Sequence, residues 1–488
     1  MMAVSLYTSR VVLNALGVED FGIYNVVGGV VAMFTVLSGS LSAAISRFIT
    51  YELGKGNQEN LNKIFSSAVT IQIGLAGIII LLAETIGIWF LNVKMNIPEM
   101  RMEAANWVFQ FSILTFAINL ISVPYNASII AHEKMSAFAY ISILEAIGKL
   151  AIAYLIVVSP MDKLIFYAIL MCVVALIVRF TYGNYCKRHF SECTYHFIWD
   201  KQLLKQMFGF AGWNFIGAAS AVLRDQGGNV VINLFCGPTV NAARGIAFQV
   251  NTAVNQFVTN FMTALNPQIT KSYAAENKEY MMTLIFQGAR LSFYMLLLLS
   301  LPILVNTHYI LELWLKIVPE HAVLFVQLVL IFAMSESISQ PLITAMLATG
   351  KIRNYQIIVG GLQMMNLPIS YLLLRLGFFP EIVIIVAICI SQCCLAVRLI
   401  LLRGMIGVSI RKYLQKVYFN ILTVSVVAVV LPLISTQYID ETFIGFIIVS
   451  LIAVICTIIS IYFIGCNRQE RQSIHQKLNA IRTKITRK

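Results

Sequence analysis

Apolar runs of 18 or more residues recur from one end of this chain to the other, separated by short polar or Pro/Gly segments. Each run is long enough for a helix to cross the hydrocarbon core of a bilayer, which takes about 20 residues. The runs far exceed the ~10 residues of a membrane β-strand, so helices are the spanning structure. The sequence therefore predicts an all-α integral membrane protein with about 14 transmembrane helices.

The composition excludes an ordinary soluble protein. Of the 488 residues, 59% are hydrophobic and 12% are charged, and the mean hydropathy is +0.81. Soluble domains have about 25% charged residues. The short first run, which begins at Met1, predicts that a true N-terminal stretch is missing.

Basic residues are concentrated in alternate loops. The net charge is +13, which in a soluble protein would suggest nucleic acid as a partner. Here 23 of the 35 Lys and Arg residues lie in loops on one side of the predicted spans and five on the other. The positive-inside rule places the basic side, with the C-terminus, in the cytoplasm. We therefore expect membrane topology, and no nucleic acid partner, to explain the charge.

An internal repeat relates spans 1–6 to spans 7–12. Short matches recur about 220 residues apart, and their shared offset argues against chance. Because six spans are an even number, the two halves would have the same orientation, as in parallel-repeat transporters that bind substrate near the midplane. The matching positions are Val11–Asn14 with Val230–Asn233, Asn57 and Glu59 with Asn277 and Glu279, and Pro124, Ala131 and Lys134 with Pro341, Ala348 and Lys351.

The repeat predicts the domain organisation. We expect an N-terminal six-helix bundle, a cytoplasmic linker with an interfacial helix, a C-terminal six-helix bundle, two extra helices and a basic amphipathic cytoplasmic tail. A solvated terminus is the alternative for the tail. These parts are predicted over residues 1–185, 186–206, 207–403, 415–465 and 466–488, respectively.

Four cations lie well inside apolar runs: Arg10, Lys149, Arg224 and Arg244. On insertion scales each costs about 2.5–3.5 kcal/mol at the centre of a bilayer, so such groups usually face a wet cavity or a partner. Arg10 and Arg244 have no acidic neighbour on their own helical turn, and they are the best candidates for binding an anion. Both also lie near the outer ends of their spans, where snorkelling is the alternative.

The other two cations have acidic neighbours. Glu145 lies four residues before Lys149, the spacing of a helical ion pair that would neutralise both. Asp225 follows Arg224 directly, but adjacent helical residues point about 100° apart, so Asp225 is free to meet a different helix.

Polar residues recur on the faces that carry these cations. Arg244, Asn251 and Asn255 begin a stripe at helical spacing, and Arg10 shares a face with Asn14. The alternative is that such stripes join helices to one another. Arg47 lies at an inner span end, where a headgroup contact and a cavity entrance are both open. The candidate substrate-binding residues are Arg10, Asn14, Arg47, Lys149, Arg224, Arg244, Asn251 and Asn255.

Acidic residues within the spans are candidates for ion coupling, because a carboxyl at that depth can carry a proton or hold Na⁺. A structural ion pair is the alternative for each. These residues are Glu84, Glu145, Asp225 and Glu336. We expect Arg179, Arg290 and Arg398, near cytoplasmic span ends, to snorkel to the headgroups.

Several chemistries have no sequence support. The chain has no GxxxxGK[ST] loop, no HExxH and no zinc spacing, and its nine cysteines do not form a disulfide or zinc pattern. Its longest predicted loop, 186–206, is too short for a catalytic domain. We therefore expect a transporter and not an enzyme, with no metal site and no cofactor apart from H⁺ or Na⁺ as a coupling ion.

Three segments, Leu6–Asn25, Ser46–Gly56 and Pro124–Met135, resemble the O-antigen flippase branch of the multidrug/oligosaccharidyl-lipid/polysaccharide (MOP) transporter superfamily. The resemblance implies a V-shaped pair of six-helix bundles in a bacterial cytoplasmic (inner) membrane. It also implies a polyprenyl-diphosphate-linked oligosaccharide, an O-antigen or capsule repeat unit, moved from the inner to the outer leaflet by alternating access. Membrane lipids, a glycan polymerase and glycosyltransferases are the further partners that it suggests.

Two other functions remain open. A MATE-like drug or cation antiporter predicts an acidic, aromatic cavity, whereas the charges buried here are mostly basic. A membrane glycan polymerase or ligase predicts a large outer loop with catalytic Arg or His residues, and every outer loop here is short.

Overall fold

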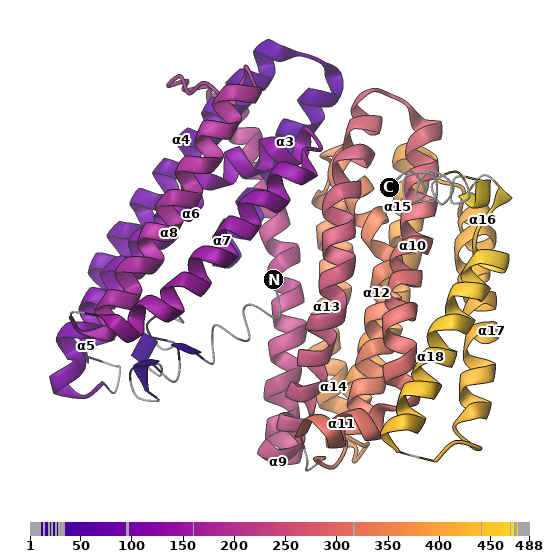
Figure 1. The fold of residues 1–488 in the computed structure, drawn as a ribbon. Coiled ribbons are helices and arrows are strands. Elements are labelled where there is room, and N and C mark those ends of the chain that lie inside the picture. The colour runs from indigo at the N-terminus through magenta and orange to yellow at the C-terminus, as the bar shows by residue number, and fades with distance from the viewer. Residues whose placement is uncertain are drawn as a thin grey trace, which may run out of the picture. The chain divides into compact units, whose positions relative to one another are not determined.

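The computed structural model describes residues 11–12, 15–17, 20, 23–24, 27, 35–93, 97–159, 161–315, 318–440, 442–468, 470–472 and 476. Within these ranges every regular element is a helix (Figure 1). Ten of the described helical stretches are long and apolar enough to cross a membrane. The predicted all-α membrane fold is thereby confirmed.

The chain divides into two compact units, residues 1–218 with 270–276 (unit 1) and residues 219–269 with 277–488 (unit 2). The helices of unit 1 are α3 (Thr35–Lys55), α4 (Gln58–Leu82), the π-helical turn η1 (Ala83–Gly87), α5 (Ile88–Val93), α6 (Glu99–Ala131), α7 (Met135–Leu155), the 3₁₀ turn η2 (Ile156–Val158) and α8 (Lys163–His189), together with both ends of α9 (Lys201–Ala274).

Unit 2 contains the middle of α9, and the two extra helices belong to it. Its other helices are α10 (Lys278–Val305), α11 (Thr307–Leu315), α12 (Ala322–Thr349), α13 (Arg353–Met364), α14 (Asn366–Arg375), α15 (Ile382–Ile406), α16 (Ile410–Tyr413), the π-helical turn η3 (Leu414–Phe419), α17 (Asn420–Ser435), α18 (Phe443–Ser460) and the π-helical turn η4 (Ile461–Gly465).

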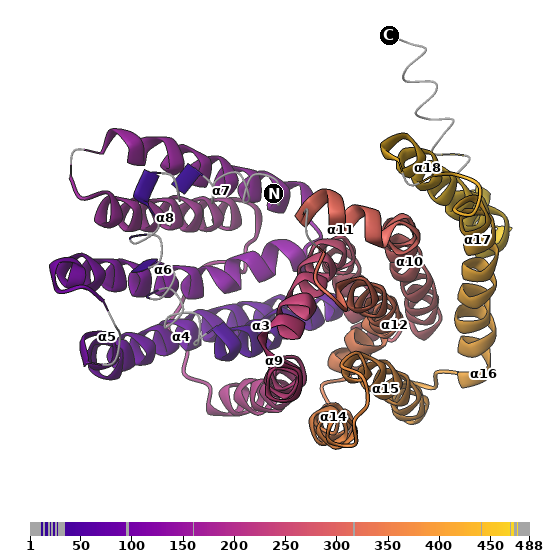
Figure 2. The same ribbon diagram turned by 90° about the horizontal axis from the view of Figure 1, so that it is seen from below.

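Each unit has one central helix. In unit 1, α6 packs against α3, α4, α7 and α8, and its buried Val108, Phe109 and Ile113 form part of the core. In unit 2, α12 packs against α10, which precedes it in the chain, and against α15, which follows it. Helix α15 also packs against α13 and α14. The extra helices α17 and α18 pack against each other and against α10 (Figure 2).

The repeat is also visible in the backbone. Three pairs of residues with positive φ occur at the repeat offset: Gly17 (84°) with Gly237 (80°), Gly56 (71°) with Glu276 (58°), and Glu133 (59°) with Gly350 (73°). Asn57 caps α4 by accepting a hydrogen bond from the Asn60 backbone N–H, and Asn277 caps α10 by accepting one from the Tyr280 N–H. Helices therefore begin and end at equivalent positions in the two halves.

Helix α9 is a hairpin of two helical legs, 201–236 and 238–274, joined at Gly237, whose φ of 80° and ψ of 179° are not helical. The prediction of a separate interfacial helix within 186–206 is wrong. Ile198–Asp200 is not helical, and Asp200 instead caps α9, accepting hydrogen bonds from the Gln202 and Leu203 N–H groups at 2.9 and 3.0 Å.

Replacing Gly237 with Ala tests whether the hairpin depends on this backbone conformation. Its φ and ψ lie in a region that is essentially restricted to glycine, so Gly237→Ala is expected to lower the free energy of unfolding by about 1–3 kcal/mol. The matched control is Gly245→Ala on the second leg, where a Cβ atom meets nothing within 4 Å. Thermal unfolding in detergent, followed by tryptophan fluorescence, should separate the two variants. Equal unfolding midpoints for the two variants would show that the hairpin does not depend on the backbone conformation of Gly237.

Candidate functional site

Arg244 links the two legs of the α9 hairpin by hydrogen bonds. Its side chain reaches from the second leg to the first, where Nη2 donates to the Asp225 backbone oxygen at 3.0 Å and Nη1 donates to Asn229 Oδ1. A Cβ atom on Gly228 would lie 3.0 Å from Nη2, so glycine at this position leaves room for the guanidinium. Arg244 is only 3% exposed. It therefore lies between helices in this structure, whereas the sequence suggested a wet cavity.

Arg224 and Asp225 pair with each other, although adjacent helical residues point about 100° apart. Arg224 Nε donates to Asp225 Oδ1 at 2.9 Å, and the guanidinium also lies 5.1 Å from the centre of the Phe332 ring. The arginine side chain is long enough to bend back and cross the angle between adjacent helical residues. The Asp225 side chain remains 41% exposed. The described hydrogen bonds of Arg224 use Nε and Nη2.

The second leg of α9 has a polar face that the rest of unit 2 does not fully cover. Asn255 Nδ2 donates to Asn251 Oδ1 at 2.6 Å, and both residues are partly exposed. Gln256, Thr259 and Asn260 are exposed beside them. Amides and hydroxyls at this depth are costly against acyl chains, so the face requires water or a polar ligand.

Glu336 lies in a network of hydroxyls between α12 and α15. It accepts a hydrogen bond from Ser391 Oγ, which lies 3.2 Å from Ser335 Oγ. Gln392 donates to Ser335 and accepts from Tyr418 on η3 at 3.2 Å. The network gives Glu336 polar neighbours within unit 2.

Two arginines expected to snorkel are instead buried, and both expectations are wrong. Arg290 donates to the Gly465 backbone oxygen at 2.9 Å and forms an ion pair with Glu470 at 2.5 Å, which ties α10 to the chain that follows η4. Arg398 is 1% exposed, and its Nε and Nη1 are buried without a hydrogen-bond partner among the described residues. Arg179 lies over the Tyr125 ring at 3.9 Å. Depth along a helix does not reveal which helix lies beside it.

Two of the candidates in unit 1 contact each other. Lys149 Nζ lies 2.6 Å from Glu145 Oε1 in the helical ion pair that the spacing suggested, with both side chains partly exposed. Glu84 lies on the π-helical turn η1 and accepts a hydrogen bond from Gln110 Nε2 at 3.1 Å. The candidates Arg10 and Asn14 lie outside the described residues.

Arg47 is surrounded by aromatic rings near the end of α3. Its Cζ lies 4.8 Å from the ring centre of Phe48, 4.7 Å from that of Tyr51 and 5.6 Å from that of Phe210. Such cation–π contacts stabilise a guanidinium without a carboxylate. Arg47 therefore has protein partners, and the headgroup contact that was left open is not needed to explain its position.

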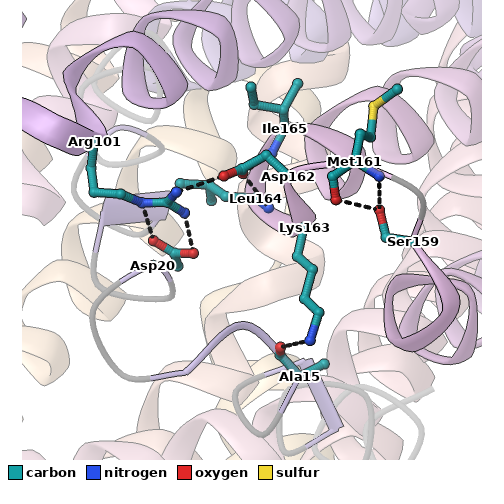
Figure 3. Close-up of polar contacts among 9 residues, drawn as sticks. All are labelled: Ala15, Asp20, Arg101, Ser159, Met161, Asp162, Lys163, Leu164 and Ile165. Carbon is teal, nitrogen blue, oxygen red and sulfur yellow. Dashed lines mark hydrogen bonds and ion pairs between the residues drawn. The ribbon is translucent and has the colours of Figure 1, made fainter.

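The predicted outer end of unit 1 has a charge cluster that sequence analysis missed (Figure 3). Arg101 donates Nε to Asp20 Oδ1 at 2.8 Å and Nη1 to Asp162 Oδ2 at 2.6 Å. Asp162 also caps α8, accepting from the Leu164 and Ile165 N–H groups. Around the cluster lies a recess of about 570 Å³, lined by Leu16, Gly17, Asp20, Arg101, Met161, Asp162 and Lys163. The carboxylates of Asp20 and Asp162 both pair with the Arg101 guanidinium, so the cluster fits a role in stabilising the fold.

Unit 2 has a pair at the equivalent place. His321 Nδ1 lies 2.6 Å from Glu381 Oε1, and these residues follow Arg101 and Asp162 by 220 and 219 positions. Each pair joins the start of a central helix to the start of the helix that packs beside it. The offset of the repeat was the one sequence signal that could have revealed both pairs.

The fold defines a class of protein. Over 83% of its length the chain superimposes on 92% of an outward-facing multidrug resistance MATE family transporter of the MOP superfamily, with a TM-score of 0.70 and 14% identity. It also superimposes, over 83% of its length and 93% of the other chain, on a MOP superfamily transporter from Pyrococcus furiosus Vc1 (DSM3638), with a TM-score of 0.67 and 14% identity. These similarities show that the chain has the fold of MOP superfamily transporters.

The chain belongs to the polysaccharide biosynthesis protein family, whose profile matches residues 3–273. It is similar to the uncharacterized membrane protein EpsK of Bacillus subtilis (strain 168), with 19% identity over 301 residues, or 61% of this chain. The match spans 58% of the length of EpsK. The predicted resemblance is confirmed at the level of this family and of the MOP transporter fold, and the protein is a multi-pass membrane protein.

The charge cluster around Arg101 should make the stability of unit 1 sensitive to acid. Burial raises the pKa of Asp162, but the hydrogen bonds from Arg101 and the Ile165 N–H outweigh it, so the pKa lies below its usual value. A lowered pKa means that ionised Asp162 stabilises the fold at neutral pH, and that this contribution is lost as the pH falls through the folded-state pKa.

We expect Asp162→Asn, which keeps a capping oxygen, to lower the free energy of unfolding at pH 7 by roughly 1 kcal/mol. The difference from wild type should shrink between pH 5 and pH 3. Thermal midpoints in an acid-stable detergent at several pH values measure it, with Glu99→Gln, an exposed carboxyl at the start of α6, as the control. A difference that stays constant with pH would rule out this role.

Proposed function

We propose that this protein is a transporter, a flippase that moves a polyprenyl-diphosphate-linked oligosaccharide, an O-antigen or capsule repeat unit, from the inner to the outer leaflet of a bacterial cytoplasmic membrane. The observation that carries the proposal is the exposed polar face of α9, which continues through Asn251 and Asn255 in an otherwise apolar span. Membership of a polysaccharide biosynthesis family supports a sugar as the transported group. The basic loops support a cytoplasmic C-terminus.

The polar face suits the sugar and the arginines suit the diphosphate. Sugar hydroxyls exchange hydrogen bonds with amides and hydroxyls such as those of Asn251, Asn255 and Thr259. Arg224 has guanidinium N–H groups beyond those bound to Asp225, and a diphosphate oxygen is a stronger anionic partner than a half-exposed carboxylate. The polyprenyl tail remains in the bilayer while the polar head crosses. Arg244, buried in the hairpin, positions the first leg in this proposal.

Coupling to H⁺ or Na⁺ is assigned to Asp225 and Glu336. Asp225 shares its charge with Arg224, so a cation bound at the carboxylate would release the guanidinium toward the diphosphate. Glu336 has a hydroxyl network that can accept or pass a proton. Glu145 is paired with Lys149, and Glu84 accepts a hydrogen bond from Gln110. We therefore assign ion coupling to neither Glu145 nor Glu84. A glycan polymerase and glycosyltransferases would be partners that supply and consume the lipid-linked glycan.

A drug or cation antiporter is the second candidate, favoured by the similarity to MATE transporter structures. The charges on the two legs of α9 argue against it. Arg224 and Arg244 outnumber Asp225 there, which disfavours a cationic cargo. Efflux of cationic dyes would distinguish an antiporter from a flippase. A membrane glycan polymerase or ligase, the remaining alternative, would instead lengthen glycan in the presence of a lipid-linked donor.

Arg224→Ala tests the diphosphate contact. We expect surface glycan in a complementation assay to fall at least tenfold, because the anionic head loses a cation on the first leg of α9. Arg224→Lys keeps the charge but not the fork of donors, and should retain part of the activity. Arg375→Ala, at an exposed arginine in the last turn of α14, is the matched control. Full glycan display by stable Arg224→Ala protein would remove this residue from the site.

Asp225→Asn tests ion coupling. In proteoliposomes, wild-type translocation of a fluorescent lipid-linked oligosaccharide should accelerate under an imposed H⁺ or Na⁺ gradient. Asp225→Asn should translocate at a rate that no longer depends on that gradient, since the amide cannot titrate or replace the carboxylate charge. Glu312→Gln, at an exposed carboxyl on α11, serves as the control. Wild-type transport that ignores both gradients would reject the role.

A further inference from the structure

A continuous line of hydrogen bonds in unit 2 runs from the carboxylate of Glu336 to the π-helical turn η3. Ser391 Oγ donates to Glu336 Oε1 and lies 3.2 Å from Ser335 Oγ. Gln392 Nε2 donates to Ser335 Oγ, and Gln392 Oε1 accepts from the Tyr418 hydroxyl on η3 at 3.2 Å. We call these five residues the Glu336 relay. All of them belong to unit 2.

Every hydrogen bond of the Glu336 relay has its acceptor on the side nearer the carboxylate. A serine hydroxyl has one proton to donate, and Ser391 donates its proton to Glu336. In the contact between the two serines, Ser391 therefore accepts and Ser335 donates. At the far end the amide oxygen of Gln392 can only accept, so Tyr418 is the donor. The Glu336 relay thus has a single direction while Glu336 accepts.

The centre of the Glu336 relay is buried between α12 and α15. Ser335 is 8% exposed and Ser391 is 3% exposed. In a setting of such low dielectric, hydrogen bonds that follow one another polarise their neighbours. A change at one end of the Glu336 relay therefore affects the bonds at the other end.

Glu336 also faces ionisable side chains on three other helices. It interacts electrostatically with Arg224 on α9, Tyr355 on α13, and Cys394 and Arg398 on α15. Arginine is not deprotonated in proteins, so the two guanidinium groups keep their charge. A proton on Glu336 would therefore remove a carboxylate charge from this group of side chains and leave both cations in place.

A proton on Glu336 would also change the hydrogen bonds of the Glu336 relay. An ionised carboxyl only accepts, whereas a protonated carboxyl has an O–H group to donate. When Glu336 donates to Ser391, both serines reverse, and the Gln392 amide turns over because its two ends differ. Tyr418 then meets an N–H group and changes from donor to acceptor. An amide has no hydroxyl proton to hand on, so the direction of hydrogen bonding is conveyed and the proton is not.

The turn η3 is where this change would act on the backbone. A π-helical turn is rare and frequently occurs at a functional site. Tyr413, directly before η3, donates to the Ile338 backbone oxygen on α12 at 3.0 Å, and a carbonyl can only accept. Tyr418, near the other end, is bonded to an amide that can donate or accept. One end of η3 is therefore held in the same way whatever the state of Glu336, and the other end is not.

The two extra helices are connected directly to η3. Asn420, the first residue of α17, donates to the Ile464 backbone oxygen on η4 at 3.1 Å and accepts from Tyr294 on α10. Helix α17 packs against α18, and both pack against α10. A change in how η3 is held would therefore reach both α17 and α18.

We propose that Gln392 and Tyr418 are positioning residues that convey the protonation of Glu336 to η3, and through η3 to α17 and α18. The inference rests on the proposed function, which assigns ion coupling to Glu336, and it gives the two extra helices a part in that coupling. It also identifies the coupling ion at Glu336 as H⁺, since only a proton gives the carboxyl a hydrogen to donate.

The test follows η3 directly by fluorine NMR of the full-length protein in nanodiscs. Trifluoromethyl-phenylalanine replaces Phe419, the last residue of η3, which is 70% exposed. We expect its resonance to move as the pH falls from 8 to 4. Glu336→Gln should reduce this movement at least threefold, because an amide does not take up the proton. Tyr418→Phe and Gln392→Leu should reduce it at least threefold as well, although Glu336 is still present.

Two matched controls separate this response from a general effect of pH or of losing a hydroxyl group. Tyr438→Phe removes the hydroxyl of a tyrosine that is 83% exposed, and the Phe419 label should then move as in wild type. The same label in place of Phe180 on α8, which is 78% exposed, should move at least threefold less than the label at Phe419.

Translocation of a lipid-linked oligosaccharide in proteoliposomes gives the second measurement. An imposed H⁺ gradient should accelerate wild type and Tyr438→Phe at least threefold more than Tyr418→Phe. Equal acceleration of Tyr418→Phe and wild type would overturn the inference.

The NMR measurement can overturn the inference independently. A Phe419 label that does not move in wild type, or moves equally in wild type, Tyr418→Phe and Gln392→Leu, would do so, as would movement that persists in Glu336→Gln. If Gln392→Leu fails to fold, Tyr418→Phe, which loses a single oxygen atom, decides. A wild type that moves no lipid-linked glycan would instead refute the proposed function, while the label still reports on the Glu336 relay.

Discussion

The cost of placing charge in hydrocarbon shapes the interior of this protein. A lone arginine at the centre of a bilayer costs about 2.5–3.5 kcal/mol on insertion scales, so each needs a partner or water. Arg224 has Asp225, Arg244 has an amide and a carbonyl across the hairpin, and Arg290 has Glu470. These partners hold helices in place as well as neutralising charge. The polar face of α9 differs, since its amides bond along one leg and still project from the fold.

The parts of the fold that depend on local sequence could be predicted from the sequence. The length of the apolar runs gives the helices, and the capping residues Asn57 and Asn277 mark where two of them begin. The repeat offset, first visible in those residues, recurs in the positive-φ positions of the backbone. The interfacial helix predicted within 186–206 does not form at Ile198–Asp200, because Asp200 caps the long helix that follows.

Much of the candidate site could not be predicted, because it depends on what lies beside each helix. Arg398 and Arg290 stand at depths where snorkelling is common, yet neighbouring helices bury both. The pairing of Arg224 with Asp225 follows from side-chain length, which a helical wheel ignores. Lys149 and Glu145 were open to prediction, since their interaction is set by spacing within a single helix. Contacts within one helix can be deduced from sequence, and contacts between helices require the structure.

The two halves share backbone features more closely than side-chain chemistry. Positive-φ residues and helix caps recur at a fixed offset, but the outer pair is Arg101 with Asp162 in one half and His321 with Glu381 in the other. Backbone positions where helices begin and end must persist in any duplicated bundle, because shifting one turn would misplace every helix after it. Interior side chains are free to diverge once each charge has a partner. We therefore expect the features that set helix ends to follow the repeat, as Asn57 and Asn277 do, and the interior charges to depart from it, as Arg224 and Arg244 do.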